Sequence, residues 1–140
     1  MYYFVNLVVY IVRNTVPTIT ATQTRKTETP NAVMTTLASP TLGGTVDLAL
    51  WRVEMAVAAS GPLHVVDSEQ LLTVLSGAAT VTLDGESHAL GAGDTIVLPA
   101  TSPRRIATDT GTQLLVAGHG DAIVTVPGED APRGTPPWIS

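Results

Sequence analysis

Short strand-like runs separated by Gly and Pro turns constrain the fold of this chain more than any other feature. The clearest signal is Asp84-Gly85, which joins two such runs and favours a tight hairpin because both turn residues need positive φ. No stretch long enough for a helix has the periodicity of an amphipathic helix. Many short strands at close spacing predict an all-β sandwich or barrel. The expected strands are 47–58, 70–75, 78–83, 86–90, 95–98, 104–108, 113–117 and 123–126.

The composition sets what such a barrel can be built from. Hydrophobic residues make up 44% of the 140 residues but aromatic residues only 4%, so the core must consist mainly of Val, Leu, Ala and Ile. This length suits one domain with one core. The run 47–58 alternates in part and predicts two faces: Trp51, Val53, Met55 and Val57 on the buried side, Arg52 and Glu54 on a solvated or paired side.

The chain divides into three parts in this interpretation. Residues 1–43 form an N-terminal strand and an extended arm, 44–126 form the barrel, and 127–140 form a Pro-rich tail on the surface that Trp138 could pin. The apolar run 1–12 is too short to span a bilayer, which takes roughly 20 residues. It is either a strand at an edge or dimer contact, or extra sequence if translation starts later.

Charge and cysteine content exclude several function classes. The net charge is −5, with seven Lys and Arg against twelve Asp and Glu, and no basic face for nucleic acid is visible. The absence of cysteine rules out disulfides, thiolate metal ligands and a cysteine nucleophile, and it fits a reducing compartment. We therefore expect a cytoplasmic protein that binds neither nucleic acid nor membrane.

Two segments carry a recognisable frame. In the first, Gln70 is followed by six residues and then Gly77; in the second, Gly93-Asp94 precedes an apolar run that ends at Pro99. Together with the hairpin between them, these segments resemble the paired motifs of the cupin superfamily over about residues 44–126. The resemblance implies a single-domain, cupin-type double-stranded β-helix, or jelly-roll barrel.

The positions at which cupins hold a metal are largely replaced here. In the family the first motif supplies two His and a Glu, and counting back from Gln70 puts His64 and Val66 at the two His positions. The second motif puts Arg104 at its His position, with Thr101 at a Gly position and Thr108 at an Asn position. Valine cannot coordinate, an amide is a weak ligand, and a guanidinium repels cations. We therefore expect no metal and no other cofactor.

Other residues could in principle restore a site. A register slip by one would turn Glu69 inward in place of Gln70 and bring Asp67 near, but it would spoil the spacing to Gly77. His88 and His119 are too isolated in sequence to assign, and His119 reads as a turn residue. Simpler interpretations of the three retained positions also stand. His64 could be a strand-end histidine, Arg104 could form a surface ion pair, and Gln70 could satisfy buried backbone groups.

Three functions follow from these residues. The first is a non-metal cupin whose pocket binds a small molecule, which could be an anion, through His64, Gln70 and Arg104. The second is an isomerase or cyclase in which His64 moves a proton beside Arg104. The third is a metal-dependent cupin oxygenase with atypical ligands. Whether the protein is an enzyme stays open. An exposed N-terminal strand edge and the resemblance to cupins both predict a homodimer. We also expect replacement of Arg104 by Leu to leave the fold intact.

Overall fold

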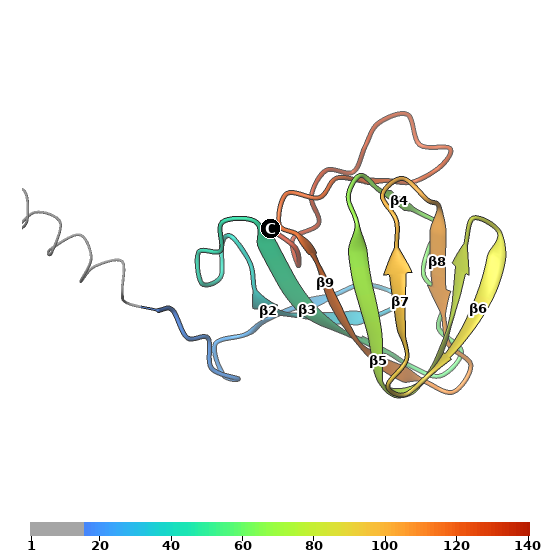
Figure 1. Ribbon diagram of the computed structural model, residues 1–140, viewed down its shortest axis with the longest axis horizontal. Helices are drawn as coiled ribbons and strands as arrows, with labels where there is room; N and C mark the ends of the chain where they lie inside the picture. The colour runs from blue at the N-terminus through green and yellow to red at the C-terminus, as the bar shows by residue number, and fades with distance from the viewer. Residues whose placement is uncertain (1–15) are drawn as a thin grey trace, which may run out of the picture.

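The computed structural model describes residues 16–140, and within them it consists of antiparallel β-strands joined by turns (Figure 1). The strands are β1 (Arg25–Glu28), β2 (Val33–Ala38), β3 (Leu48–Met55), β4 (Val65–Val66), β5 (Gln70–Leu83), β6 (Glu86–Gly91), β7 (Thr95–Leu98), β8 (Arg104–Ala107), β9 (Thr112–His119) and β10 (Val124–Thr125). The all-β barrel predicted from strand spacing is confirmed. In this part of the chain, no helix is long and apolar enough to cross a membrane. The strand expected at 1–12 lies outside the described residues.

One sheet carries most of the structure. Its strands follow the order β1-β2-β3-β9-β5-β6, and β7 and β8 also pair with β5. A small second sheet joins β10 to β4. The two halves of β5 therefore have different neighbours: residues 70–73 pair with both β9 and β7, and residues 80–83 pair with both β6 and β8. This change of neighbours folds the sheet back on itself and closes the barrel.

The corner in β5 depends on Gly77. The sequence predicts a break at this point, but the strand continues through it with an irregular register against β9 after Val74. Gly77 has a φ of 74°, and a Cβ added to it would overlap the carbonyl oxygen of Gly111. Glycine is therefore required for both backbone conformation and close approach. The two strands predicted at 70–75 and 78–83 are therefore one long bent strand. The glycine bends the chain without ending its pairing.

The predicted hairpin at Asp84-Gly85 is present between β5 and β6. Asp84 has a φ of 50° and Gly85 a φ of 83°, the pair of positive values that a two-residue turn of this kind needs. A second turn places Gly93, with a φ of 90°, before β7, and the Asp94 carboxylate accepts a hydrogen bond of 2.8 Å from the Gly91 amide. Both turns hold the strands that form the cavity wall in register.

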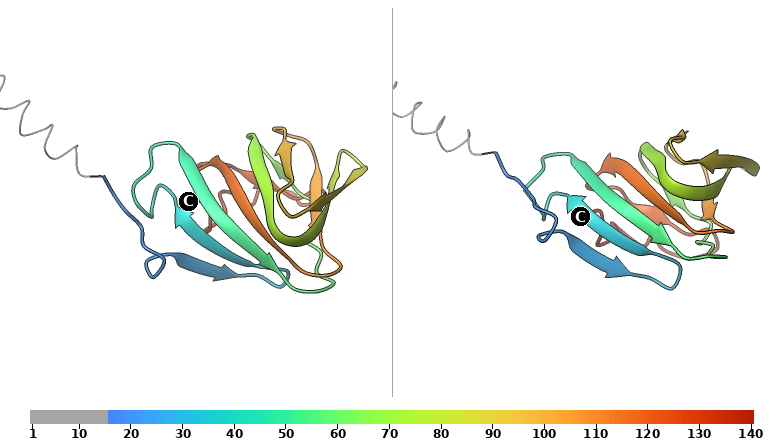
Figure 2. Two further views of the ribbon diagram at one scale, coloured as in Figure 1. Left: turned by 60° about the horizontal axis from the view of Figure 1, so that its bottom comes forward. Right: turned by 90° about the horizontal axis from the view of Figure 1, so that it is seen from below.

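The segment before residue 43 differs from its sequence interpretation. Part of the expected extended arm forms β1 and β2, which lie beside β3 at the edge of the main sheet (Figure 2). Periodicity is weak there because Thr35 and Thr36, adjacent in sequence and on opposite faces, are both buried. Buried threonines make a strand look like a polar loop.

The core has the composition that the sequence predicts. Along β3, Ala49, Trp51, Val53 and Met55 are buried and Arg52 and Glu54 are exposed. Val57, expected on the buried face, is 70% exposed because the strand ends at Met55. The largest fully buried side chain of the described residues belongs to Arg104. A guanidinium in this position calls for an explanation in terms of the site.

Candidate functional site

A cavity of about 100 Å³ lies inside the barrel, walled by the sheets and by the C-terminal segment 136–140. His64 and Gln70 are its polar lining residues. The others are apolar: Trp51, Val53, Val66, Leu72, Leu98, Ile106, Val116, Val124, Pro136, Trp138 and Ile139. An apolar wall with a few convergent polar groups is the usual composition of a small-molecule site.

His64 reaches the cavity from the residue just before β4. Its main chain forms an isolated antiparallel bridge with Arg104, and its Nδ1 lies 3.0 Å from the carbonyl oxygen of Pro62. Because a carbonyl only accepts, the proton of the neutral ring belongs on Nδ1, which leaves Nε2 with its lone pair. His64 therefore has the backbone partner that the strand-end interpretation gives it, and it also lines the cavity.

Arg104 is completely buried and lies behind Gln70. Its Nε donates to the Ser102 carbonyl at 3.1 Å, its Nη2 to the Pro99 carbonyl at 2.6 Å, and its Nη1 to Gln70 Oε1 at 3.4 Å. Within residues 16–140 it has no carboxylate partner. The alternative of a surface ion pair for Arg104 is wrong, because the side chain is buried among neutral acceptors.

These contacts change what a substitution at Arg104 should do. The guanidinium ties the loop between β7 and β8 to the start of β5, so it supports the fold as well as the site. The expectation that Arg104→Leu leaves the fold intact does not fit this arrangement. Gln70, in turn, is 6% exposed and uses its carbonyl oxygen for Arg104 rather than for a backbone group. Arg104 is therefore a positioning residue for Gln70.

Charge in the site favours a neutral imidazole. The pKa of His64 lies below its usual value, chiefly because burial disfavours the charged ring. The hydrogen bond to Pro62 works in the opposite direction, and the positive charges of Arg104 and Arg133 lower the pKa further. Burial also lowers the pKa of Arg104, and the negative charge of Asp84 opposes that shift. Arginine nevertheless stays charged at neutral pH.

The donor set does not fit a transition metal. The four positions that the family uses hold one imidazole, one valine, one amide bonded to a guanidinium, and that buried guanidinium. In the described part of the chain, no group of three His, Asp or Glu side chains could hold a metal ion. The register slip considered for Glu69 does not occur, because Gln70 is buried and Glu69 is exposed. Asp67 instead accepts a hydrogen bond of 2.9 Å from the Ile123 amide.

A second cavity, of about 590 Å³, adjoins the first on its outer side. The two share His64, Val124, Pro136 and Trp138 as lining residues. The remaining wall of the outer cavity comes from the β1–β2 turn, from Pro62 and from the chain after β10: Thr29, Pro30, Asn31, Pro62, Val126, Arg133, Gly134, Thr135 and Pro137. We call this outer cavity the vestibule.

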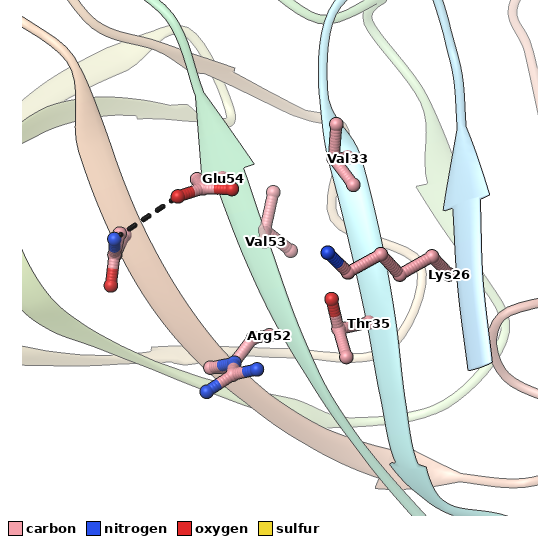
Figure 3. Close-up of a pocket in the computed structure, with 7 residues that line it drawn as sticks. Lys26, Val33, Thr35, Arg52, Val53 and Glu54 are labelled. Carbon is pink, nitrogen blue, oxygen red and sulfur yellow. Dashed lines mark hydrogen bonds between the residues drawn. The ribbon is translucent and has the colours of Figure 1, made fainter. Parts of the chain in front are cut away.

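A third hollow, of about 230 Å³, lies on β1, β2 and β3 and is separate from this site (Figure 3). Lys26, Arg52 and Glu54 project around it, and Glu54 accepts a hydrogen bond of 3.1 Å from Gln113. These side chains are exposed and of mixed sign. They form the solvated and partly paired strand face that the sequence predicts for Arg52 and Glu54.

A comparison with protein families decides the identity of the fold. The family model of the cupin domain matches residues 51–126, more than half of the chain. The chain belongs to the cupin family. The resemblance of the two sequence motifs is thereby confirmed. Gly93 and Pro99 of this cupin stand at the turn and the strand end that the second motif predicts, and Gly77 lies at the bend within β5. No curated protein is significantly similar to it in sequence.

Solved cupin structures share the fold at low sequence identity. An RmlC-like cupin from Shewanella frigidimarina has a TM-score of 0.64 and 21% identity, covering 73% of this chain and 88% of that one. The polyketide cyclase RemF from Streptomyces resistomycificus has a TM-score of 0.65 and 21% identity, with coverages of 83% and 82%. The salicylate 1,2-dioxygenase from Pseudoaminobacter salicylatoxidans has a TM-score of 0.65 and 20% identity, with coverages of 75% and 31%. Likeness at this level establishes the jelly-roll fold.

Sequence reasoning missed the contribution of the C-terminal segment to the site. Trp138 and Ile139 line the barrel cavity, and Ile139 is 2% exposed. The sequence instead predicts a tail on the surface that Trp138 could hold in place. The available signal was the pair of large apolar residues that ends an otherwise Pro-rich and polar stretch. His88 and His119, which the sequence left unassigned, do not line the barrel cavity or the vestibule.

Proposed function

We propose that this cupin binds a small organic anion in its barrel cavity and does so without a metal ion. The observation that carries the proposal is the buried guanidinium of Arg104, whose hydrogen bonds go to neutral oxygens alone. A buried cation with no carboxylate partner gives the protein interior a positive potential that solvent screens weakly. Arg104 also lowers the pKa of His64, which supports the idea that its field reaches the cavity wall.

The cavity residues divide into two roles in this proposal. Val66, Leu72 and their apolar neighbours receive the hydrocarbon part of the ligand. His64 and Gln70 contact its polar end, and Arg104 orients Gln70 and supplies the positive potential. With Gln70 Oε1 turned toward Arg104, the amide hydrogens on Nε2 are the part of the side chain suited to an anion. An aromatic or aliphatic carboxylate combines the required apolar body and negative end.

Methyl-resolved nuclear magnetic resonance tests this proposal with phenylacetate as the probe. We expect phenylacetate to shift the methyl signals of Val66, Leu72 and Val116, which line the cavity. The methyl signals of Leu71 and Val97 serve as the internal control, because these side chains are 45% and 52% exposed on the outside of the sheet. Shifts confined to the outer methyl groups, or no shifts at millimolar phenylacetate, would contradict the proposal.

A second candidate function is acid–base catalysis of an isomerisation or cyclisation. The specific observation in its favour is that His64 lines the cavity and that its bond to Pro62 and its lowered pKa leave a neutral ring with an unprotonated Nε2. RemF, a cupin of similar fold, is a polyketide cyclase. Under this hypothesis, His64→Asn abolishes turnover and largely spares ligand binding. Equal loss of both would leave His64 a binding residue only.

We further propose a homodimer. In the described residues, β1 ends the main sheet and pairs with β2 along one side only. An unpaired strand edge of this kind invites pairing with another chain. Multi-angle light scattering of the full chain should give the mass of two chains. A monomer at high micromolar concentration would contradict the proposal.

A further inference from the structure

The C-terminal segment 136–140 borders both the barrel cavity and the vestibule. The barrel cavity and the vestibule share Pro136 and Trp138 from this segment, and His64 and Val124 from the barrel. Figure 1 shows the chain after β10 running across the same end of the barrel as β4. The segment is thus part of the cavity wall rather than a surface tail.

The sizes of the two cavities suggest that they act together. Sites for organic ligands commonly measure about 300–1,000 Å³. The barrel cavity, at about 100 Å³, lies below this range and suits only the smallest organic anions, whereas the vestibule, at about 590 Å³, lies within it. The polar groups His64 and Gln70 nevertheless line the small cavity. A ligand that reaches Gln70 and also fills the vestibule must pass the indole of Trp138.

The segment is held closed mainly by side-chain hydrogen bonds from β1, β2 and the residues after β2. Thr36 Oγ1 donates to the Trp138 carbonyl at 2.7 Å, and Ser39 Oγ donates to the Ser140 oxygen at 2.8 Å. The other donors are Thr41, at 2.6 Å to Ser140, and Arg25, at 2.9 Å to Pro137 and 2.8 Å to Ser140. We call Arg25, Thr36, Ser39 and Thr41 the latch.

Opening the segment breaks the latch bonds and exposes Ile139. Within 136–140, Ile139 is the residue that is fully buried, and Trp138 is half-buried. The latch makes five hydrogen bonds to the segment. Those from Thr41 to Ser140 and from Arg25 to Pro137 lie in exposed positions where water can replace them, and the other three are partly buried. Local opening needs to break only the contacts of this segment and not those of the barrel.

The vestibule also has a charge preference. His64 and Arg133 are the titratable residues among those that line it, and both are basic. Arg133 is paired with Glu129 at 2.8 Å in an exposed position, which leaves its remaining N–H groups accessible. No Asp or Glu lines the vestibule within residues 16–140, although the chain as a whole has a net charge of −5. An anion can therefore bind the N–H groups of Arg133 that Glu129 leaves free, and it meets the positive potential of Arg104 at Gln70.

We infer that segment 136–140 is a gate, and that when Trp138 swings outward the vestibule and the barrel cavity form one site for an elongated apolar carboxylate. This inference rests on the proposed anion-binding function and adds the route, the size and the control element of the site. The ligand displaces part of the segment, so binding and latch strength are coupled. In a two-state gate, the apparent affinity is the intrinsic affinity multiplied by the fraction of open molecules.

The first experiment follows the gate residue itself. The chain has two tryptophans, so Trp51→Phe leaves Trp138 as the only one. Phenylacetate absorbs little light at the wavelengths that excite tryptophan. We expect its binding to move Trp138 emission to longer wavelength and to make it more accessible to acrylamide quenching. Unchanged Trp138 emission, while the cavity methyl signals of the same variant shift, would overturn the gate and leave the proposed function standing.

The second experiment weakens the latch. Thr36→Val keeps the shape of the side chain and removes its hydrogen bond to the Trp138 carbonyl. We expect phenylacetate to bind about fivefold more tightly, since one net hydrogen bond changes an equilibrium by about that factor. Ser39→Ala should act in the same direction. The matched control is Thr80→Val, at an exposed threonine of β5 remote from the segment, which should bind like the native chain.

The outcomes separate the two ideas. Tighter binding in Thr36→Val and Ser39→Ala, with Thr80→Val unchanged, supports the gate. Equal affinity in all four proteins overturns it, because the closed segment would then not compete with the ligand. If phenylacetate fails to bind any of the proteins, the proposed function fails first and the gate fails with it. Circular dichroism and thermal unfolding of each variant confirm that the native fold is being compared.

Discussion

The main chains of His64 and Arg104 are joined by two hydrogen bonds of 2.9 Å, one in each direction. Directly opposed residues of an antiparallel pair project to the same side of the sheet. One of these side chains reaches the cavity wall and the other is enclosed behind Gln70. The bridge thus places a buried positive charge next to the polar end of the cavity. The two residues come from separate motifs.

Arg104→Met should destabilise the protein. The change leaves the carbonyl groups of Pro99 and Ser102 without their donor, and buried acceptors without partners are costly. We expect the free energy of unfolding in urea to fall by about 2–4 kcal/mol. The matched control is Arg105→Met, at the exposed neighbour on the same strand, which should change it by less than about 0.5 kcal/mol. Equal stability of the two variants would contradict a structural role for Arg104.

Gln70→Glu should remove the preference of the site for an anion. A carboxylate at this position would pair with Arg104 and cancel its positive potential. We expect phenylacetate affinity in calorimetry to fall about tenfold, which corresponds to about 1.4 kcal/mol. Gln23→Glu, in the exposed N-terminal segment, adds the same charge away from the cavity and should have little effect. The account fails if both variants bind phenylacetate as the native chain does.

His64 should make the stability depend on pH in a defined direction. Its pKa in the folded state is lowered, so below about pH 6.5 the unfolded chain takes up a proton that the folded state resists. The free energy of unfolding therefore falls as the pH drops from neutrality, until the pH reaches the folded-state pKa. His64→Asn should flatten this part of the profile, measured by urea unfolding between pH 7 and 5 (about the range in which histidine titrates).

A histidine elsewhere provides the comparison for that profile. His119 is exposed at the end of β9, so His119→Asn is the matched control for removing a histidine outside the site. If His64→Asn and His119→Asn change the pH dependence of the free energy of unfolding equally, burial of the His64 ring is not the cause of that dependence.

Gly77→Ala should be far more harmful than Gly85→Ala. Both glycines have positive φ, which costs an alanine about 1–2 kcal/mol. At Gly85 a Cβ meets no atom within 4 Å, so the backbone term is the whole effect. At Gly77 it would overlap the Gly111 carbonyl, and the two strands would have to separate. We expect Gly77→Ala to lose at least about 2 kcal/mol more in thermal or urea unfolding; equal losses would argue against the close approach at the corner.

The sequence predicted the barrel because its strongest signals are local. The Asp84-Gly85 hairpin and the β7 run ending at Leu98 depend on turn geometry and alternation within a few residues, and both appear as expected. The motif frame assigned His64 and Arg104 to two site positions, and the main chains of these residues form a direct bridge. The motif frame could not predict which groups surround the side chain of Arg104. Burial and hydrogen bonding depend on the loop after Pro99, whose path is set by tertiary packing.

The largest gap concerns segments distant in sequence. Nothing local indicates that Thr36 would be buried or that it would bond Trp138, because that contact joins the second strand to the chain's far end. The Pro-rich composition of 127–140 correctly indicated an absence of regular structure over most of that stretch, apart from the turns. That composition did not indicate that the side chain of Ile139 would be buried.

Calorimetric titration of chelator-treated protein tests the central claim most directly, with phenylacetate compared against phenylethanol. The two molecules have similar size and apolar surface but differ in charge. The account predicts one phenylacetate bound per chain in the absence of metal, at least about tenfold more tightly than phenylethanol. Equal affinity for the two molecules, or phenylacetate binding only after iron, manganese, nickel or zinc is added back, would contradict it.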